Sequence, residues 1–377
     1  LAKNLVNKTT TTRKHEHRYD LAQASEFDAD KVILQSNHGN VSVQGSNVVA
    51  ENGLWAKGKN IEIKEAENRV YSQDIEMKQK SGLMGAGIGF TIGQQKQALE
   101  VDQTRLSASG SQVGSLHGNT TIIADNNYTQ TASALSAIKG DVNILAKNAK
   151  IQAADDKYES NMKQTFEQKG LTIALTSPIL DAINAVQGAV KSAQTMGKSK
   201  SSRVNAMAVA NTAYSSVQAG RAVAGLAGMG AGAGQSGGDS SGIKISITYG
   251  QQQSESKTHV EGKTAAKSQV NADGKVNIVA TAVGKDANID IIGSDVSGKQ
   301  GTTLIADNQV NIKAAEQTHM ERSTNKSSGF NVGVAIAIGK GVSAGLTVGG
   351  NYGKGYGNGD EVSYVASHVG DSNSKTV

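Results

Sequence analysis

The sequence predicts an all-β protein, a right-handed parallel β-helix solenoid from which β-hairpins protrude, with one small helical insertion. Three observations lead to this fold class. The 377-residue chain has 44 glycines, one proline and only 4% aromatic residues. Short segments alternate apolar and polar residues with a period of two, as β-strands do. These segments also recur along the chain, which is the sequence signature of a solenoid.

Composition narrows the possible functions. A compact domain of this length usually buries more large aromatic side chains, so we expect a narrow core of small aliphatic residues. The chain has no cysteine, which excludes disulfides and thiolate metal sites. The net charge of +5 is small and the charges are mixed, so we expect no nucleic-acid partner. Leu1 begins in the middle of a strand pattern, and we therefore interpret residues 1–377 as one β-helix fragment of a longer protein.

Internal repeats set the predicted period. Residues 45–48, 110–113 and 293–296 share the pattern Gly-Ser-x-Val. A closing block of alternating apolar residues ends 22 residues after Gly45 and 23 residues after Gly293, but 45 residues after Gly110. These spacings predict about 20 residues per turn and an additional turn in the middle copy.

Alternation also predicts which side chains lie inside. The aliphatic residues expected in the core are Val43, Ile63, Ile123, Ile144, Ile151, Ile278, Ile305 and Ile312. Glycine and asparagine tolerate left-handed backbone conformations, so they mark the predicted corners. These corner residues are Gly39, Asn40, Gly53, Asn60, Asn126, Asn148 and Asn308.

Each copy is followed by a polar run that cannot line a core. We expect extended β-hairpins at about 71–105, 156–268 and 317–360, and the returning half of an earlier hairpin at residues 8–19. Alternation in residues 171–175 and 243–247 predicts that these two segments pair. The intervening residues, about 177–242, would form a helical insertion at the tip, beginning with a serine cap and a proline.

The repeats Gly-Ser-x-Val, Ile-Ala-Asp-Asn and Ile-x-Ala-Ala-Glu are followed, in the last copy, by Lys-Ser-Ser-Gly-Phe-Asn-Val-Gly-Val. Over nearly the whole chain this pattern resembles the second filamentous-haemagglutinin repeat region of two-partner-secretion exoproteins, a group of large adhesins and CdiA proteins of contact-dependent growth inhibition. The resemblance implies a filament secreted to the surface of a Gram-negative bacterium. It also implies an outer-membrane transporter as export partner and a target-cell surface or outer membrane as contact partner.

The predicted function is therefore a structural and delivery segment of such a filament, supporting contact with target cells and toxin translocation across their outer membrane. One alternative is an adhesin segment that binds host cells or glycans. Another is a carbohydrate-active β-helix enzyme using Asp125, Asp155 and Asp307. Because these carboxylates recur at corner positions in each copy, we expect a structural role for them. We predict no enzyme activity, no cofactor and no small-molecule substrate.

Two sets of candidate binding residues remain. His15 and His17 lie on one face of a predicted strand, but no third ligand is evident, so we expect no metal there. Apolar residues in the hairpins and in the helical insertion either cover the flank of the β-helix or contact a membrane or partner. They are Ile88, Phe90, Ile92, Ile179, Ile183, Val186, Val190, Phe330, Val332, Val334 and Ile336.

Overall fold

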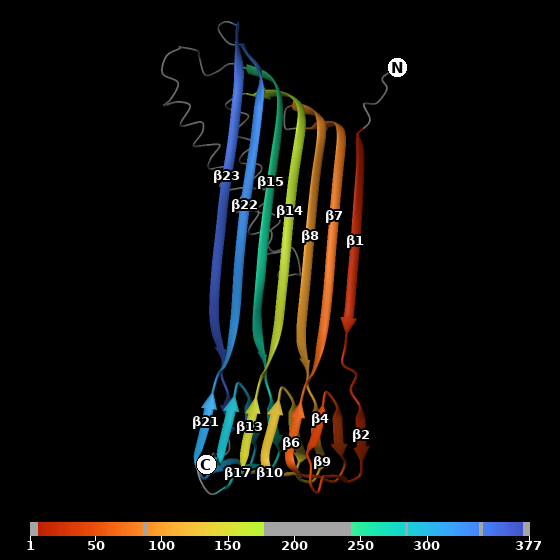
Figure 1. Ribbon diagram of the computed structural model, residues 1–377, viewed down its shortest axis with the longest axis vertical. Coiled ribbons are helices and arrows are strands. Elements are labelled where there is room, and N and C mark those ends of the chain that lie inside the picture. Colours follow the sequence, from red (N-terminus) through yellow and green to blue (C-terminus); the bar gives the residue numbers. More distant parts are fainter. Residues whose placement is uncertain (1–6, 86–88, 177–242, 283–285, 339–341, 372–377) are drawn as a thin grey trace.

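The computed structural model describes residues 7–85, 89–176, 243–282, 286–338 and 342–371, and every regular element in this part is a β-strand. The strands form two parallel sheets and one antiparallel sheet (Figure 1). This confirms the all-β class. The predicted helical insertion at 177–242 lies outside the described residues. No helix in the described ranges is long and apolar enough to cross a bilayer.

The chain alternates between the two parallel sheets. Each turn gives one strand to the first sheet, and one long or two short strands to the second. The first sheet contains β2 (Glu26–Ala29), β5 (Asn47–Ala50), β9 (Gln112–His117), β11 (Ala134–Lys139), β16 (Gln269–Ala272), β19 (Asp295–Gly298) and β24 (His368–Val369). The second contains β3 (Val32–Gln35), β4 (Val41–Gln44), β6 (Leu54–Lys64), β10 (Thr120–Thr131), β12 (Val142–Ala146), β13 (Asn148–Gln152), β17 (Lys275–Ala280), β18 (Asn288–Ile292), β20 (Gly301–Ala306) and β21 (Gln309–Lys313). This path is consistent with a parallel β-helix.

Asparagine side chains connect successive turns at one corner. Asn60 donates to Asn40, Asn148 to Asn127 and Asn308 to Asn288, across 20 to 21 residues of sequence. The predicted period of about 20 residues is therefore confirmed. The predicted corner residue Asn126 is one position off, because its neighbour Asn127 makes the corner contact.

The repeated Gly-Ser pair forms a second corner. Gly45 and Gly293 have φ angles of 52° and 55°, a conformation that favours glycine. Backbone N–H groups of serines in this column donate to the serine hydroxyl of a neighbouring turn, as Ser111 does to Ser133 at 3.0 Å. The motif thus has a physical role, which is to turn the backbone and link the turns.

The core lies between the parallel sheets. It is filled mainly by valine, isoleucine and alanine, with Val276, Ile278 and Ile289 fully buried. One aromatic residue, Tyr128, is buried among them, and its hydroxyl donates to Gln130 Oε1 at 2.7 Å. The Gln130 amide in turn donates to the carbonyls of Ser133 and Gln269. The narrow aliphatic core agrees with the composition.

Of the eight predicted core residues, Val43, Ile63, Ile144, Ile151 and Ile278 are buried. The inward orientation predicted for Ile123 and Ile305 is wrong, because both side chains point to the outer face and Ile305 is 50% exposed. Ile312 has the inward register, aligned with buried Ile291, but it is 52% exposed. It lies on β21, the last strand of its sheet among the described residues, so no further turn covers it there.

The antiparallel sheet extends away from the turns (Figure 1). In spatial order its strands are β1 (Lys8–Asp20), β7 (Ala66–Gly85), β8 (Gly89–Ser109), β14 (Ala154–Thr176), β15 (Ile243–Ala266), β22 (Ala315–Ile338) and β23 (Val342–Val365). Ile173 faces Ile247 across β14 and β15, so the predicted pairing of these segments is confirmed. Residues 8–19 lie in β1, which pairs with β7.

Two turns separate each antiparallel pair from the next. Turns β2–β4 and β5–β6 precede β7; β9–β10 and β11–β13 precede β14; and β16–β18 and β19–β21 precede β22. The stretch from Gly110 to its closing block does contain two turns, as the doubled spacing predicts, but the additional turn is not confined to the middle copy, because a first turn also precedes Gly45 and Gly293. Gly45 and Gly293 open the second turn of their intervals, whereas Gly110 opens the first, which accounts for the different spacings.

Candidate functional site at the tip of the antiparallel sheet

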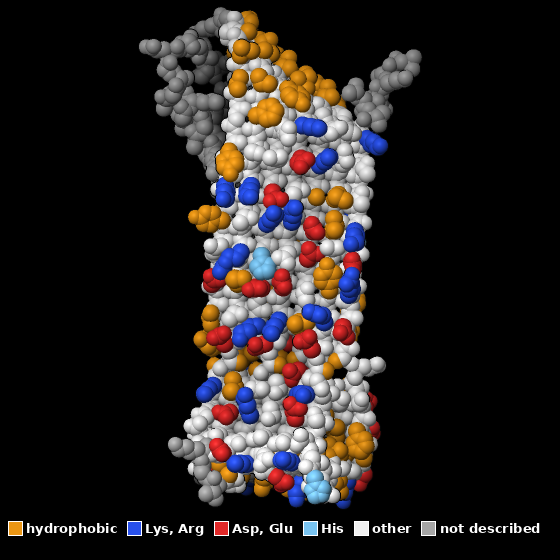
Figure 2. Space-filling view, in the orientation of Figure 1, with side chains coloured by type: hydrophobic (Ala, Val, Ile, Leu, Met, Phe, Trp, Pro, Cys, Tyr) orange, Lys and Arg blue, Asp and Glu red, His pale blue; other side chains and the backbone are white. Residues whose placement is uncertain are grey.

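The tip is the end of the antiparallel sheet farthest from the parallel turns, and it carries an apolar face. Partners in adjacent strands point to the same side of a sheet, so the strand register aligns the side chains in rows across it. One row contains Phe90, Ile173, Ile247, Val334 and Leu346. The next contains Leu83, Ile92, Leu171, Tyr249, Val332 and Val348. Figure 2 shows hydrophobic side chains gathered at this end.

The opposite face of the tip is small and polar. A row lying between the two apolar rows contains Thr91, Thr172, Thr248, Gly333 and Thr347, which alternate with the apolar residues along their strands. The Thr91 and Thr172 hydroxyls are hydrogen-bonded at 2.9 Å. The tip is therefore an amphipathic sheet, apolar on one side and rich in threonine and glycine on the other.

A row of glycines marks the lower edge of the tip. Gly82, Gly93, Gly170 and Gly250 are consecutive partners across β7, β8, β14 and β15. The strands approach closely there, because a Cβ at Gly93 would lie 2.1 Å from the Lys169 carbonyl oxygen. Glycine at these positions permits a close approach that any side chain would prevent.

Below the glycine row the sheet carries many charged residues, and several of them form ion pairs. Glu255 contacts Lys257 at 3.0 Å and Lys163 at 3.6 Å, and Lys263 contacts Asp155 at 3.4 Å. The Lys257 ammonium beside Glu255 lowers the pKa of that carboxyl. Figure 2 shows these mixed charges in bands beneath the apolar end. We refer to this part as the polar shaft.

Most of the predicted contact residues in the described part of the chain lie together on the apolar face of the tip. Phe90, Ile92, Phe330, Val332 and Val334 are exposed, and Ile336 is half-buried. Phe330 is aligned with Gln251 at the boundary with the polar shaft. The remaining predicted residues, Ile88, Ile179, Ile183, Val186 and Val190, lie outside the described residues. Sequence reasoning missed Leu346 and Val348, which are 85% and 82% exposed on the edge strand β23.

Two of the three predicted corner carboxylates have separate structural partners. Asp155 lies at the base of β14 beside Lys263, and Asp307 accepts a hydrogen bond from the Ala282 amide at 2.9 Å. Asp125 lies in β10 and is exposed. Within the described ranges, the only group of three histidine or acidic side chains with close donor atoms is His15, His17 and Asp74. The predicted histidine pair thus has a neighbouring carboxylate that sequence reasoning missed.

Comparison with known proteins identifies the family. Residues 7–170 and 247–377 match the family model described as hemagglutinin repeat. The chain is 33% identical over 339 residues to a "tRNA nuclease CdiA" of Escherichia coli strain NC101, covering 88% of this chain and 10% of that protein. It is 33% identical over 340 residues to a "16S rRNA endonuclease CdiA" of Enterobacter cloacae subsp. cloacae, covering 87% and 10%.

A "tRNA nuclease CdiA" of Burkholderia pseudomallei is 30% identical over 315 residues, covering 82% of this chain and 24% of that protein. The chain therefore spans only about a tenth to a quarter of the length of these relatives. No solved structure matches the chain. The chain belongs to the hemagglutinin repeat family and corresponds to the filamentous-haemagglutinin repeat region of CdiA-type proteins.

Proposed function

We propose that this segment is a structural and delivery element of a secreted surface filament. The parallel turns form a right-handed parallel β-helix that serves as the body of the filament. The antiparallel sheet projects from it and brings its tip to the outer membrane of a target cell, supporting passage of a toxin carried elsewhere in the complete protein. In this proposal the segment itself performs no catalysis and binds no nucleic acid.

The filament role is supported by the family and by the turns. The relatives bear the name CdiA, and such exoproteins are exported by an outer-membrane two-partner-secretion transporter, which we take as the export partner here. Phe27 on β2 and Ile312 on β21 have the register of core residues, being aligned with Val48 and Ile291, yet both are about half exposed. Stacking of further turns on either side would cover them.

The apolar face of the tip is the observation that carries the membrane role. Several adjacent strands expose aliphatic and aromatic side chains on this face without a charged residue among the two apolar rows. A contiguous exposed apolar surface is typical of a membrane or protein contact. Strands inside a bilayer must satisfy all their backbone groups, so insertion beyond the interface requires the edges β1 and β23 to find partners.

The second candidate function, adhesion to glycans, is favoured by exposed tyrosines. Tyr249, Tyr352 and Tyr356 are exposed on the same face of the sheet as the apolar rows. Aromatic rings combine an apolar surface with a polar group, as a sugar-binding surface requires. If this is the main role, glycan binding should fail in a Tyr352→Ala Tyr356→Ala variant while vesicle binding is retained.

The test of the membrane role is a charge placed on one face of the tip. Leu346→Glu puts a carboxylate on the apolar face, where it opposes burial in lipid. Ser343→Glu is the matched control, since Ser343 lies on the opposite face of the same strand. We expect Leu346→Glu to abolish flotation of the protein with vesicles of outer-membrane lipids, whereas Ser343→Glu keeps it.

The same pair tests delivery in the complete exoprotein. Inhibitor cells displaying Leu346→Glu should lose most killing of target cells in a mixing assay, at unchanged surface display, and those displaying Ser343→Glu should not. Full killing by Leu346→Glu, with vesicle binding also unchanged, would rule out the tip as the membrane contact and leave only the scaffold role.

A further inference from the structure

We propose that His15, His17 and Asp74 form a binding site for a divalent cation of the Zn²⁺ class, and that the bound ion fastens the edge strand β1 to β7. The site lies on the polar shaft, away from the apolar tip, and the proposal is independent of membrane contact. The site consists of the two histidines that the sequence indicates and of Asp74, which the pairing of β1 with β7 brings beside them.

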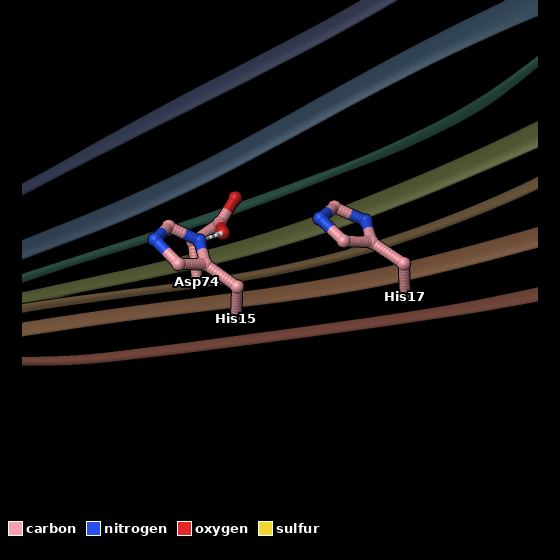
Figure 3. A group of neighbouring side chains, drawn as sticks. All are labelled: His15, His17 and Asp74. Atoms are coloured by element: carbon pink, nitrogen blue, oxygen red, sulfur yellow. Dashed lines mark hydrogen bonds and ion pairs between the residues drawn. The ribbon is translucent and has the colours of Figure 1, made fainter.

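The geometry comes from antiparallel pairing (Figure 3). His15 and His17 are two residues apart on β1, so both rings project from the same face. His15 is paired with Asp74 on β7, and its Nδ1 is in direct contact with Asp74 Oδ1. One donor atom from each of the three side chains lies within 4.8 Å of the other two.

The donor set selects the class of metal. Two imidazole nitrogens and one carboxylate oxygen form a known zinc ligand set, with a water completing the tetrahedron. The same donors suit Cu²⁺ and Ni²⁺, whereas Ca²⁺ and Mg²⁺ prefer oxygen alone. Bonds of about 2.0–2.2 Å place tetrahedral ligands roughly 3.4 Å apart. The widest donor separation, at most 4.8 Å, must therefore close, and the shorter contact between His15 and Asp74 must open. The His15 and Asp74 side chains are 62% and 47% exposed, which leaves them room to rotate.

The surrounding charges permit a cation. Arg13 is on the same face, but its guanidinium is paired with Glu76 at 3.2 Å. The same-face residues on the other side of the site are Tyr19, Ser72 and Val70, which carry no charge. Lys78 shares this face too, but it lies beyond the Arg13–Glu76 row, four residues from Asp74.

The ion has a structural consequence because β1 is an edge strand. Among the strands that the structure describes, only β7 pairs with it, and nearly all side chains of β1 are exposed. A metal held by two residues of β1 and one of β7 is a cross-link between the strands, in addition to their backbone hydrogen bonds. The cation should therefore reduce local opening at the edge of the sheet.

Isothermal titration of untagged, metal-free protein with ZnCl₂ tests the site. We expect one ion per chain in the wild type. His17→Ala and Asp74→Asn should each weaken affinity by at least about 10-fold, the loss typical of removing even a supporting partner of a metal ligand. His259→Ala is the matched control, because His259 on β15 contacts Glu261 at 3.4 Å but has no second imidazole beside it. It should bind like the wild type.

Hydrogen exchange measures the fastening. Zn²⁺ should slow exchange of β1 amides in the wild type and in His259→Ala, but not in His17→Ala. Equal zinc affinity in the wild type and His17→Ala would overturn the site. Zinc binding by the wild type with unchanged β1 exchange would overturn the fastening of the strand.

Discussion

The parallel turns and the antiparallel sheet use the same strand geometry but are stabilised differently. The turns enclose a core in which residues such as Ile144 and Val276 are fully buried. In the described residues of the seven antiparallel strands, only Thr91 and Ala335 are buried. That sheet depends on backbone hydrogen bonds, on cross-strand side-chain pairs and on its attachment to the turns. A wide sheet can therefore persist without a core when a packed scaffold sets the positions of its strands.

The largest expected effect comes from removing core volume in the turns. Ile144 is buried and is aligned with Ile122 and Ile278 in adjacent turns. Ile144→Ala should lower the free energy of unfolding by about 2–5 kcal/mol through lost burial and a residual cavity. Thr10→Ala, on exposed β1, should change it very little. Denaturant melts measure both, and equal losses would contradict the division into a cored and an uncored region.

The buried polar network in the core gives the next largest effect. In Tyr128→Phe, Gln130 Oε1 loses the donor that lies 2.7 Å away. Leaving that acceptor unpaired should cost about 1–3 kcal/mol in a denaturant melt. Tyr356→Phe, on the exposed edge strand β23, should leave stability unchanged.

Alkaline pH gives an independent test of the same network. Burial raises the pKa of Tyr128 above its ordinary value. Free tyrosine titrates near pH 10, so above that pH the unfolded chain loses a proton that the folded chain keeps. Stability should therefore fall as pH rises past about 10, more steeply in the wild type than in Tyr128→Phe. Parallel slopes for the two proteins would show that Tyr128 is accessible to solvent.

A smaller, local effect should follow from crowding the glycine row. In Gly93→Ala the new Cβ would meet the Lys169 carbonyl oxygen at 2.1 Å, forcing β8 and β14 apart. We expect a local cost of about 1–3 kcal/mol, seen as faster hydrogen exchange in these strands. The melting of the turns should stay unchanged. Gly355→Ala is the control, because nothing lies within 4 Å of its added Cβ. Cooperative destabilisation of the whole protein would show that the two regions unfold together.

The smallest effect belongs to the ion pairs of the polar shaft. Glu255→Gln removes the carboxylate that Lys257 and Lys163 contact. Exposed pairs of this kind contribute roughly 0.2–1 kcal/mol. The loss should disappear in about 1 M salt, where charges are screened over about 3 Å. A loss of several kcal/mol that persists in salt would mean that the shaft is packed rather than solvated.

Sequence alone predicted the strands well where alternation was unambiguous. In residues 276–278 a polar residue separates two aliphatic ones, so only one face can be apolar, and Val276 and Ile278 are buried as expected. Ile122–Ile123 and Leu304–Ile305 are adjacent apolar pairs, so alternation fits either member as the inward one, and the prediction places the outward-facing Ile123 and Ile305 inside. The exposure of Ile312 depends on whether another turn stacks on β21, and the local sequence pattern around Ile312 does not indicate this.

In the candidate sites too, residues that alternate along one strand were predictable, whereas contacts between distant strands were not. Val332 and Val334 were found because they alternate along one strand. Leu346 and Val348 lie in a glycine-rich stretch with a weaker pattern, and their exposure follows from the edge position of β23. Asp74 was missed because its approach to His15 depends on register between strands 59 residues apart. Contacts set by register over such distances have no short sequence signal.

The count of two turns for every antiparallel pair limits how such a protein can change its length. Neighbouring strands lie about 4.8 Å apart in either kind of sheet, so two turns and two antiparallel strands advance by the same roughly 9.6 Å. Duplication of a whole module keeps both advancing in step. Loss of a single turn would leave a projecting pair about 4.8 Å out of place and its hydrogen-bonding edge unmatched. Genes of this kind should therefore lengthen and shorten in whole modules, with single-turn changes rare among functional proteins.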